Sequence, residues 1–199
     1  RSAFFPVQLR LSLPWTALPI ALALAAATLY AQPAGSSPSI RSVPATLIAG
    51  GIELDGSLDE QHWRDAPKIG ELVQRIPNSG AKPSEKTEVT ILYDKHNLYI
   101  GVMCYDSEPN KVLAAQMTRD STMATDDRVE LLLDTFHDRT NAFYFATNPN
   151  GAFLDGLIFA NGETNNDWDA IWNVRARRHD KGWSAEFATT VLSGMSSRA

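Results

Sequence analysis

The chain has 199 residues, of which 44% are hydrophobic and 21% are charged, and this is the composition of an ordinary globular protein. The formal net charge is −5 at pH 7, and no basic stripe interleaved with aromatic residues is present, so nucleic acid is not expected as a partner. The single cysteine, Cys104, excludes an internal disulfide, so the fold must be stabilised by its hydrophobic core.

The first 31 residues have the pattern of a secretory signal peptide. Arg1 and Arg10 precede an uncharged apolar run over residues 18–30, and the small residue Ala31 is followed by a polar break. The run is shorter than the roughly 20 apolar residues that a transmembrane helix needs, and an uncleaved N-terminal anchor is the alternative. We therefore expect an exported protein, with the signal peptide over residues 1–31.

The ordered domain is expected to span residues 50–190. Residues 32–49 are rich in Pro, Ser and Ala, which is typical of a flexible linker. Residues 51–57 are predicted to form a short strand that runs into an Asp-Gly turn. Residues 59–66 predict one or two helical turns, which end before Pro67.

From Thr87 onward the hydrophobic pattern has a period of two, which is typical of β-strands. Alternating segments flank short polar turns and predict three hairpins, formed by residues 87–93 with 98–105, 142–147 with 153–159, and 172–179 with 183–187. Residues 128–134 are apolar on both faces near their middle, as a central strand should be. This pattern predicts an all-β antiparallel sandwich of the immunoglobulin or jelly-roll type, with one short helical turn near its start.

Acidic residues gather at three places along the chain. Asp126 and Asp127 precede the predicted central strand, Asp134 follows it, and a third group lies within residues 165–169. Carboxylate and amide oxygens in loops suit a hard cation such as calcium, so Asp126, Asp127 and Asp134 are candidate calcium ligands. The chain has no calcium loop of fixed spacing, and turn-forming and strand-capping aspartates are the alternative interpretation.

The sequence does not predict a catalytic site within this chain. Asp126, Glu130 and Asp169 could serve a glycoside hydrolase only if two of these carboxylates faced each other across a cleft, and no sequence feature places them so. No Ser or Cys lies in a nucleophile elbow, and the four histidines lack the spacing of zinc ligands.

The loop before residue 172 favours saccharide binding. Sugar rings expose C–H bonds that stack on flat aromatic rings, while their hydroxyls hydrogen-bond to Asp, Asn, Arg and Gln side chains. Trp168 lies in such a mixed polar loop, so its ring is the main candidate platform. The other candidate residues are Trp172, Asn166, Asp167 and Asp169. For Trp172 a place in the hydrophobic core is the alternative.

Four segments of the chain occur in a familiar order. They read Ile52-Glu-Leu-Asp-Gly-Ser-Leu-Asp-Glu-Gln-His-Trp-Arg-Asp-Ala66, Asp94-Lys-His-Asn-Leu-Tyr-Ile-Gly-Val102, Asp126-Asp-Arg-Val-Glu-Leu-Leu-Leu-Asp134 and Gly182-Trp-Ser-Ala-Glu186. In these segments the chain resembles the family 9 carbohydrate-binding-module-like domains. The resemblance implies a calcium-tolerant β-sandwich that binds a glycan or polysaccharide and is often linked to glycoside hydrolases and carbohydrate catabolism.

Residues 134–139, 148–151 and 166–169 resemble more narrowly a subgroup of bacterial exported proteins. In that subgroup the module precedes a C-terminal β-barrel-like region associated with the outer membrane. This resemblance implies a location in the periplasm, in the outer membrane or outside the cell. It also implies the alternative function of a structural domain that packs on the barrel. Residues 191–199 depart from the family pattern and are expected to be a truncated C-terminus.

Overall fold

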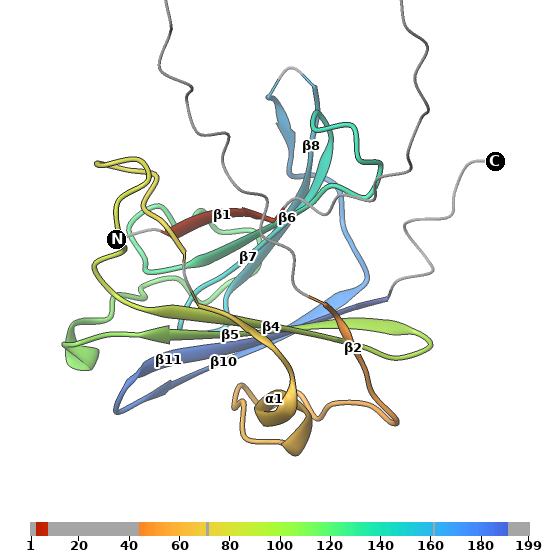
Figure 1. Cartoon of the computed structure of the whole chain (residues 1–199). Coiled ribbons are helices and arrows are strands. Elements are labelled where there is room, and N and C mark those ends of the chain that lie inside the picture. The colour runs from red at the N-terminus through yellow and green to blue at the C-terminus, as the bar shows by residue number, and fades with distance from the viewer. Residues whose placement is uncertain (1–2, 8–43, 71, 161, 191–199) are drawn as a thin grey trace, which may run out of the picture.

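Two β-sheets make up the fold, which confirms the predicted β-sandwich. The computed structural model describes residues 3–7, 44–70, 72–160 and 162–190. Sheet A has the strand order β1-β6-β7-β8-β9, and sheet B has the order β10-β11-β5-β4-β2, with β3 paired to β4. Figure 1 shows the two sheets as separate layers, with α1 on the side of sheet B that faces away from sheet A.

The strands are short, as the spacing of the turns predicts. Sheet A contains β1 (Ala3–Val7), β6 (Val129–Leu133), β7 (Ala142–Thr147), β8 (Phe153–Ile158) and β9 (Thr164–Asn165). Sheet B contains β2 (Thr46–Leu47), β3 (Lys68–Ile69), β4 (Thr87–Tyr93), β5 (Asn97–Tyr105), β10 (Trp172–His179) and β11 (Gly182–Thr190). The predicted helical turn is α1 (Gln61–Asp65), and a 3-10 turn, η1, spans Pro109–Lys111.

All three predicted hairpins are present, because each combines alternating strands with a turn that its own residues stabilise. Between β4 and β5 the Asp94 carboxylate accepts hydrogen bonds of 2.7 Å from the backbone N–H groups of His96 and Asn97. Between β10 and β11 the turn ends at Gly182, whose φ is 131°. A Cβ at Gly182 would lie 2.1 Å from the carbonyl oxygen of Cys104, so only glycine fits there.

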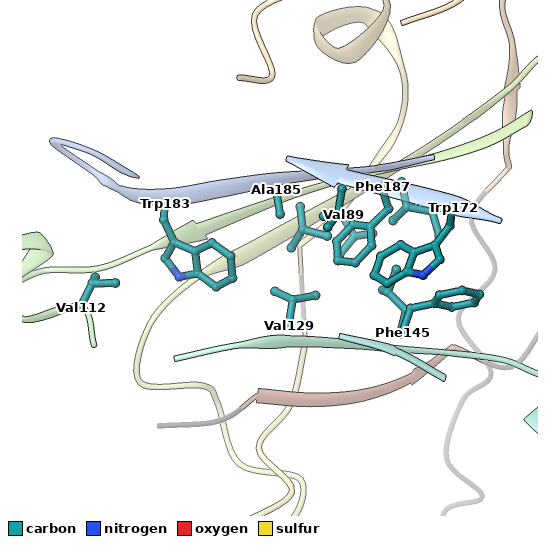
Figure 2. Close-up of a cluster of buried hydrophobic side chains, with 12 residues drawn as sticks. Val89, Val112, Val129, Phe145, Trp172, Trp183, Ala185 and Phe187 are labelled. Carbon is teal, nitrogen blue, oxygen red and sulfur yellow. The ribbon is translucent and has the colours of Figure 1, made fainter. Parts of the chain in front are cut away.

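The main hydrophobic core lies between the two sheets, because alternate side chains of each strand point inward. Figure 2 shows these side chains, which include Val89, Val112, Val129, Phe145, Trp172, Trp183, Ala185 and Phe187. The Trp172 ring stacks on Phe187 with centroids 5.9 Å apart and meets the rings of Phe145 and Phe153 edge-on at 4.9 and 5.3 Å. Aromatic pairs of this kind make Trp172 a central core residue.

The start of the domain differs from the sequence prediction. Residues 51–54 form no strand, whereas Thr46–Leu47 forms β2 and Ile48 is buried, so the fold already includes the end of the predicted linker. β2 pairs with β4 in parallel, and β1 pairs with β6 in parallel. The antiparallel prediction was inferred from short connections, and it does not apply to segments that are far apart in the chain.

Most of the predicted signal peptide and all of the predicted truncated C-terminus lie outside the described residues. These two assignments therefore stay predictions. Within the described part of the chain, no helix is long and apolar enough to span a membrane.

Candidate functional site

A hollow of about 190 Å³ lies on the outer face of sheet A, and we call it hollow A. On β6, β7 and β8 the core residues alternate with residues that point outward, and outward-pointing Tyr144 and Leu154 line the hollow. The rest of its lining comes from the loop before β6 and consists of Thr122, Met123, Ala124 and Arg128.

The loop before β6 lies across this face and forms one wall of hollow A. Met123 is only 3% exposed, because it packs on a small apolar cluster made by Ala146, Ala152 and Leu154. Burial of these side chains stabilises the position of the wall. Each Å² of apolar surface that is removed from water contributes about 25 cal/mol of free energy. The hollow therefore has a defined apolar side.

The Asp126 carboxylate holds the base of the same loop. It accepts hydrogen bonds of 3.0 Å from the backbone N–H groups of Ala115 and Gln116 and one of 2.7 Å from the Asn148 amide. Burial alone would raise the pKa of Asp126, but these hydrogen bonds outweigh it and hold the pKa below its ordinary value. Asp126 is therefore a structural carboxylate that joins several loops.

The three predicted calcium ligands do not converge. Asp126 and Asp127 precede β6 and Asp134 follows it, so the whole strand separates them. Asp134 instead accepts hydrogen bonds from the backbone N–H groups of Asp138 and Arg139 at 3.3 and 2.9 Å. In the described part of the chain no group of three or more His, Cys, Asp or Glu side chains could hold a metal. The observed contacts are those of turn-forming and capping aspartates, and calcium binding stays a prediction.

Arg128, Glu130 and Tyr144 form a hydrogen-bonded set beside hollow A. Glu130 is 5% exposed, and its Oε1 accepts hydrogen bonds from Arg128 Nε at 2.5 Å and from Tyr144 Oη at 3.1 Å. Arg128 Nη1 also donates to the Met123 carbonyl at 2.6 Å, which fixes the guanidinium against the wall. Both bonds to Glu130 end on Oε1, so within the described residues Oε2 is left to accept from a ligand.

Tyr144 keeps its proton in this set. Burial and the neighbouring Glu130 carboxylate raise the pKa of the phenol well above its ordinary range. The hydroxyl therefore donates to Glu130, and its own oxygen can accept a hydrogen bond from a ligand.

Asn166 extends the polar set across the sheet. Gly156 of β8 pairs with Tyr144 of β7, and the Oδ1 atom of Asn166 lies 3.0 Å from the position that a Cβ of Gly156 would occupy. Asn166 therefore lies over the strand next to Tyr144, and its side chain is exposed. Of the five predicted saccharide-binding residues, this is the one that the structure places beside hollow A.

The two predicted tryptophan platforms have other neighbours. Trp172 is 7% exposed and surrounded by core rings, so the core alternative holds for it and its faces are not available to a ligand. Trp168 is half-buried, and its ring packs against Phe143 with centroids 5.1 Å apart, at the edge of the core. Trp168 therefore covers one end of the core and offers at most part of its ring to solvent.

The two remaining candidates, Asp167 and Asp169, are exposed. Asp169 forms an ion pair with Arg119, whose guanidinium also contacts the fully buried Asp155 at 3.1 Å. Asp155 in turn accepts a 2.6 Å hydrogen bond from the backbone N–H of Ala170. These contacts join the loop before β6 to the loop before β10, so Asp169 takes part in holding two loops together.

Sequence reasoning missed Arg128 and Tyr144 as site residues and considered Glu130 only as a candidate acid. A charged residue inside the apolar strand β6 was the available signal, because a buried carboxylate requires a partner. The partner comes from β7, and the sequence does not show which residues of two strands lie side by side.

Comparison with known proteins supports the fold assignment. No protein-family model and no curated protein matches the chain. A family 9 carbohydrate-binding module from Caldicellulosiruptor kristjanssonii in complex with cellotriose is similar, with 18% identity, a TM-score of 0.51, and coverage of 75% of this chain and 68% of the other. A family 9 module from the same organism in complex with glucose has 17% identity, a TM-score of 0.51, and coverage of 75% and 70%. A candidate carbohydrate-binding protein from Bacteroides uniformis has 12% identity, a TM-score of 0.54, and coverage of 74% and 71%. At these identities the similarity establishes that the chain shares the β-sandwich fold of these proteins.

Proposed function

We propose that the chain is a non-catalytic saccharide-binding module and that hollow A holds one sugar unit. The hydrogen-bonded set of Arg128, Glu130 and Tyr144 carries this proposal, because it lies beside the apolar side chains of Met123 and Leu154. A pyranose ring requires this combination, since it presents C–H bonds to apolar surfaces and hydroxyls to charged groups. Two solved structures of the same fold contain glucose and cellotriose, which supports the assignment.

The size of hollow A limits how much of a glycan it can hold. Its volume of about 190 Å³ lies below the roughly 300–1,000 Å³ that is usual for sites enclosing a drug-sized ligand. The hollow therefore suits one unit of a polysaccharide, with the remaining units in solvent.

Each polar group has a distinct role in this proposal. Oε2 of Glu130 accepts from sugar hydroxyls, and Nη2 of Arg128 donates to a ring or hydroxyl oxygen. Asn166 can do both through its amide, from the neighbouring strand. The Tyr144 ring supplies the flat surface, and its hydroxyl fixes the orientation of Glu130.

The signal-peptide pattern extends the proposal to an exported protein that binds polysaccharide in the periplasm, at the outer membrane or outside the cell. A structural domain that packs on an outer-membrane β-barrel is the second candidate function. It is favoured by Ala124, because this wall of hollow A offers only a methyl group and no aromatic ring to a sugar.

A titration of the full chain, followed by NMR, tests the saccharide proposal. Glucose and cello-oligosaccharides come first, followed by a panel of other neutral glycans at millimolar concentration. We expect shifts in the signals of Tyr144 and Asn166. Asn166→Ala should weaken binding about fivefold, because it removes hydrogen bonds worth about 1 kcal/mol. Asp167→Ala, a change at the neighbouring exposed residue, is the matched control and should bind as the parent does.

A lack of any shift at hollow A with every glycan of the panel would refute the saccharide proposal. The structural-domain alternative would then be favoured, provided that the spectrum of the chain is that of a folded protein. Equal losses in Asn166→Ala and Asp167→Ala would place the site on the loop before β10 rather than in hollow A.

A further inference from the structure

A larger hollow, of about 670 Å³, lies on the outer face of sheet B, and we call it groove B. Its floor is formed by β4 and β5, and its walls come from the segment around α1 and from the β10–β11 hairpin. The volume falls within the roughly 300–1,000 Å³ that ligand sites usually have. Figure 1 shows the two sheets as separate layers, and the lining residues place hollow A on the outer face of sheet A and groove B on the outer face of sheet B, so they are separate sites.

Groove B exists because the segment before β3 covers only half of this face. Trp63 lies against the sheet at Gly101, where an added Cβ would stand 2.9 Å from the indole ring. The Trp63 Nε1–H donates to the buried Glu186 at 2.9 Å, and Ser184 Oγ donates to the Gly56 carbonyl at 2.6 Å. These contacts fix one wall of the groove. The uncovered half of the sheet, which includes Met103 and Tyr105, is its floor.

The charge in groove B differs from that of the whole chain. The formal net charge of the chain is −5. The lining of groove B has three acidic side chains and four cationic ones, but the Arg178 guanidinium donates to the Val112 carbonyl at 3.0 Å, so Lys68, Arg177 and Lys181 are the cations left to face a ligand. Charges of the two signs therefore nearly balance in groove B, in contrast to the acidic protein as a whole, and cations that are not tightly paired there can attract an anion.

The acid on the groove floor is already neutralised. Glu88 forms an ion pair with Lys86, whose Nζ lies 2.6 Å from Oε1, and it accepts a 3.1 Å hydrogen bond from the Tyr105 hydroxyl. Burial would raise the pKa of Glu88, but these contacts outweigh burial and hold the pKa below its ordinary value. Glu88 thus stays ionised and paired, and it does little to repel a second anion.

The cations at the rim are only loosely paired. Lys68 Nζ is 4.0 Å from Glu88, and Arg177 Nη1 is 3.8 Å from Asp55 and donates a 2.8 Å hydrogen bond to the neutral Ser57 hydroxyl. Among the described residues no ion pair or hydrogen bond engages the ammonium group of Lys181. An incoming anion interacts more favourably with loosely paired, exposed cations than with cations that are already held in tight bidentate pairs.

We propose that groove B binds an anionic saccharide, one whose carboxylate or sulfate group is held by Lys68, Arg177 and Lys181. The half-buried Tyr105 ring and Met103 provide apolar contact for the body of a sugar ring. The Thr90 hydroxyl lies near the floor for its neutral oxygens, whereas Ser184, whose proton is donated to Gly56, can only accept there. The site is independent of hollow A, which has the chemistry for a neutral sugar.

A binding comparison with the full chain tests groove B. The probes are a galacturonate trisaccharide, a sulfated galactose trisaccharide and a neutral galactose trisaccharide. We expect at least one anionic probe to bind more tightly than the neutral probe, and the difference to shrink as the salt concentration rises. Lys181→Gln and Lys68→Gln should each weaken anion binding about threefold to fivefold. Lys95→Gln, in the turn at the far end of the β4–β5 hairpin, is the control and should have no effect.

Comparison of the two anionic probes shows whether the groove prefers a carboxylate or a sulfate group. Either preference supports the proposal. Equal binding of neutral and anionic probes, or equal losses in Lys181→Gln and Lys95→Gln, would overturn it. Asn166→Ala separates the two sites, because it should leave anion binding unchanged. If Asn166→Ala abolished anion binding and Lys181→Gln did not, groove B would be refuted and hollow A would hold the acidic sugar.

Discussion

Replacing Glu186 by Gln should change how the stability of the protein depends on pH. The Glu186 side chain is fully buried under the segment before α1. Its two carboxylate oxygens accept hydrogen bonds from the backbone N–H groups of Asp55 and Gly56, at 2.9 and 2.7 Å, and from Trp63 Nε1 at 2.9 Å. Burial is nevertheless the largest influence, and it raises the pKa of Glu186 from 4.5 to about 7.

The sign of the effect follows from linkage. The unfolded chain titrates this group near 4.5 and the folded chain near 7, so the folded state holds the proton more tightly. The stabilisation is complete below pH 4.5 and is lost as the pH rises to about 7. At about 1.4 kcal/mol per pH unit, the total loss is about 3 kcal/mol, of which about 2 kcal/mol falls between pH 5 and 7.

His179 acts in the opposite direction within the same window. Burial lowers the pKa of its imidazole, so protonation favours the unfolded chain and stability falls as the pH falls. Both the parent and the Glu186→Gln protein should therefore carry His179→Gln, which removes this second titration from the comparison.

Urea unfolding, followed by tryptophan fluorescence at about pH 5 and about pH 7, measures the difference. Between the two conditions the free energy of unfolding should fall by about 2 kcal/mol more in the parent than in Glu186→Gln, where a smaller fall remains because burial also raises the pKa of Glu60. At about pH 5 the variant should be less stable by about 1–3 kcal/mol, because the glutamine NH₂ faces a buried N–H donor. Parallel pH profiles of the two proteins would refute the reasoning, because the three donors would then keep the carboxylate ionised throughout.

Three further predictions concern the fold. Gly101→Ala should lower the free energy of unfolding by about 1–3 kcal/mol, because its Cβ would lie 2.9 Å from the Trp63 ring. In the control Gly70→Ala, where the nearest atom is 3.9 Å away, urea unfolding should show a change below about 1 kcal/mol. Asn148→Ala should cost about 2–4 kcal/mol in the same assay, because its buried amide makes hydrogen bonds to four other residues. Burial raises the pKa of the Cys104 thiol to about 12, so a thiol reagent at neutral pH should react only after unfolding, and rapid reaction of the native protein would contradict this.

The sequence predicts the strands of the second half of the chain well because their hydrophobic alternation is strong. β10 alternates apolar and polar residues, so its extent and inward face can be read from the sequence, whereas β11 spans Gly182–Thr190 and extends beyond the predicted residues 183–187. β2 could not be predicted in the same way. Two residues have no measurable period, and Thr46 and Leu47 become a strand only because the edge of β4 is available to them.

The candidate site was less accessible to sequence reasoning than the fold. Polar residues in a loop, such as Asn166, can be recognised as exposed, and the structure agrees. The role of a tryptophan is ambiguous in a sequence, because the same ring can stack on a ligand or pack in the hydrophobic core. The neighbours of Trp172 decide its role, and they come from β7, β8 and β11, which are distant in the chain.

Two glycines inside strands show what the sequence can indicate about a site and what it cannot. Gly101 and Gly156 both lie inside strands, and a glycine there often marks the close approach of another group. At Gly101 the approaching groups include Trp63, which gives groove B its fixed wall, and at Gly156 they are Asn165 and Asn166, which lie over the strand next to Tyr144. The sequence indicates the approach but not the partner. The partners on the two outer faces therefore have to be tested separately. Asn166→Ala alters the outer face of sheet A and Lys181→Gln alters groove B, and each variant leaves the other face intact.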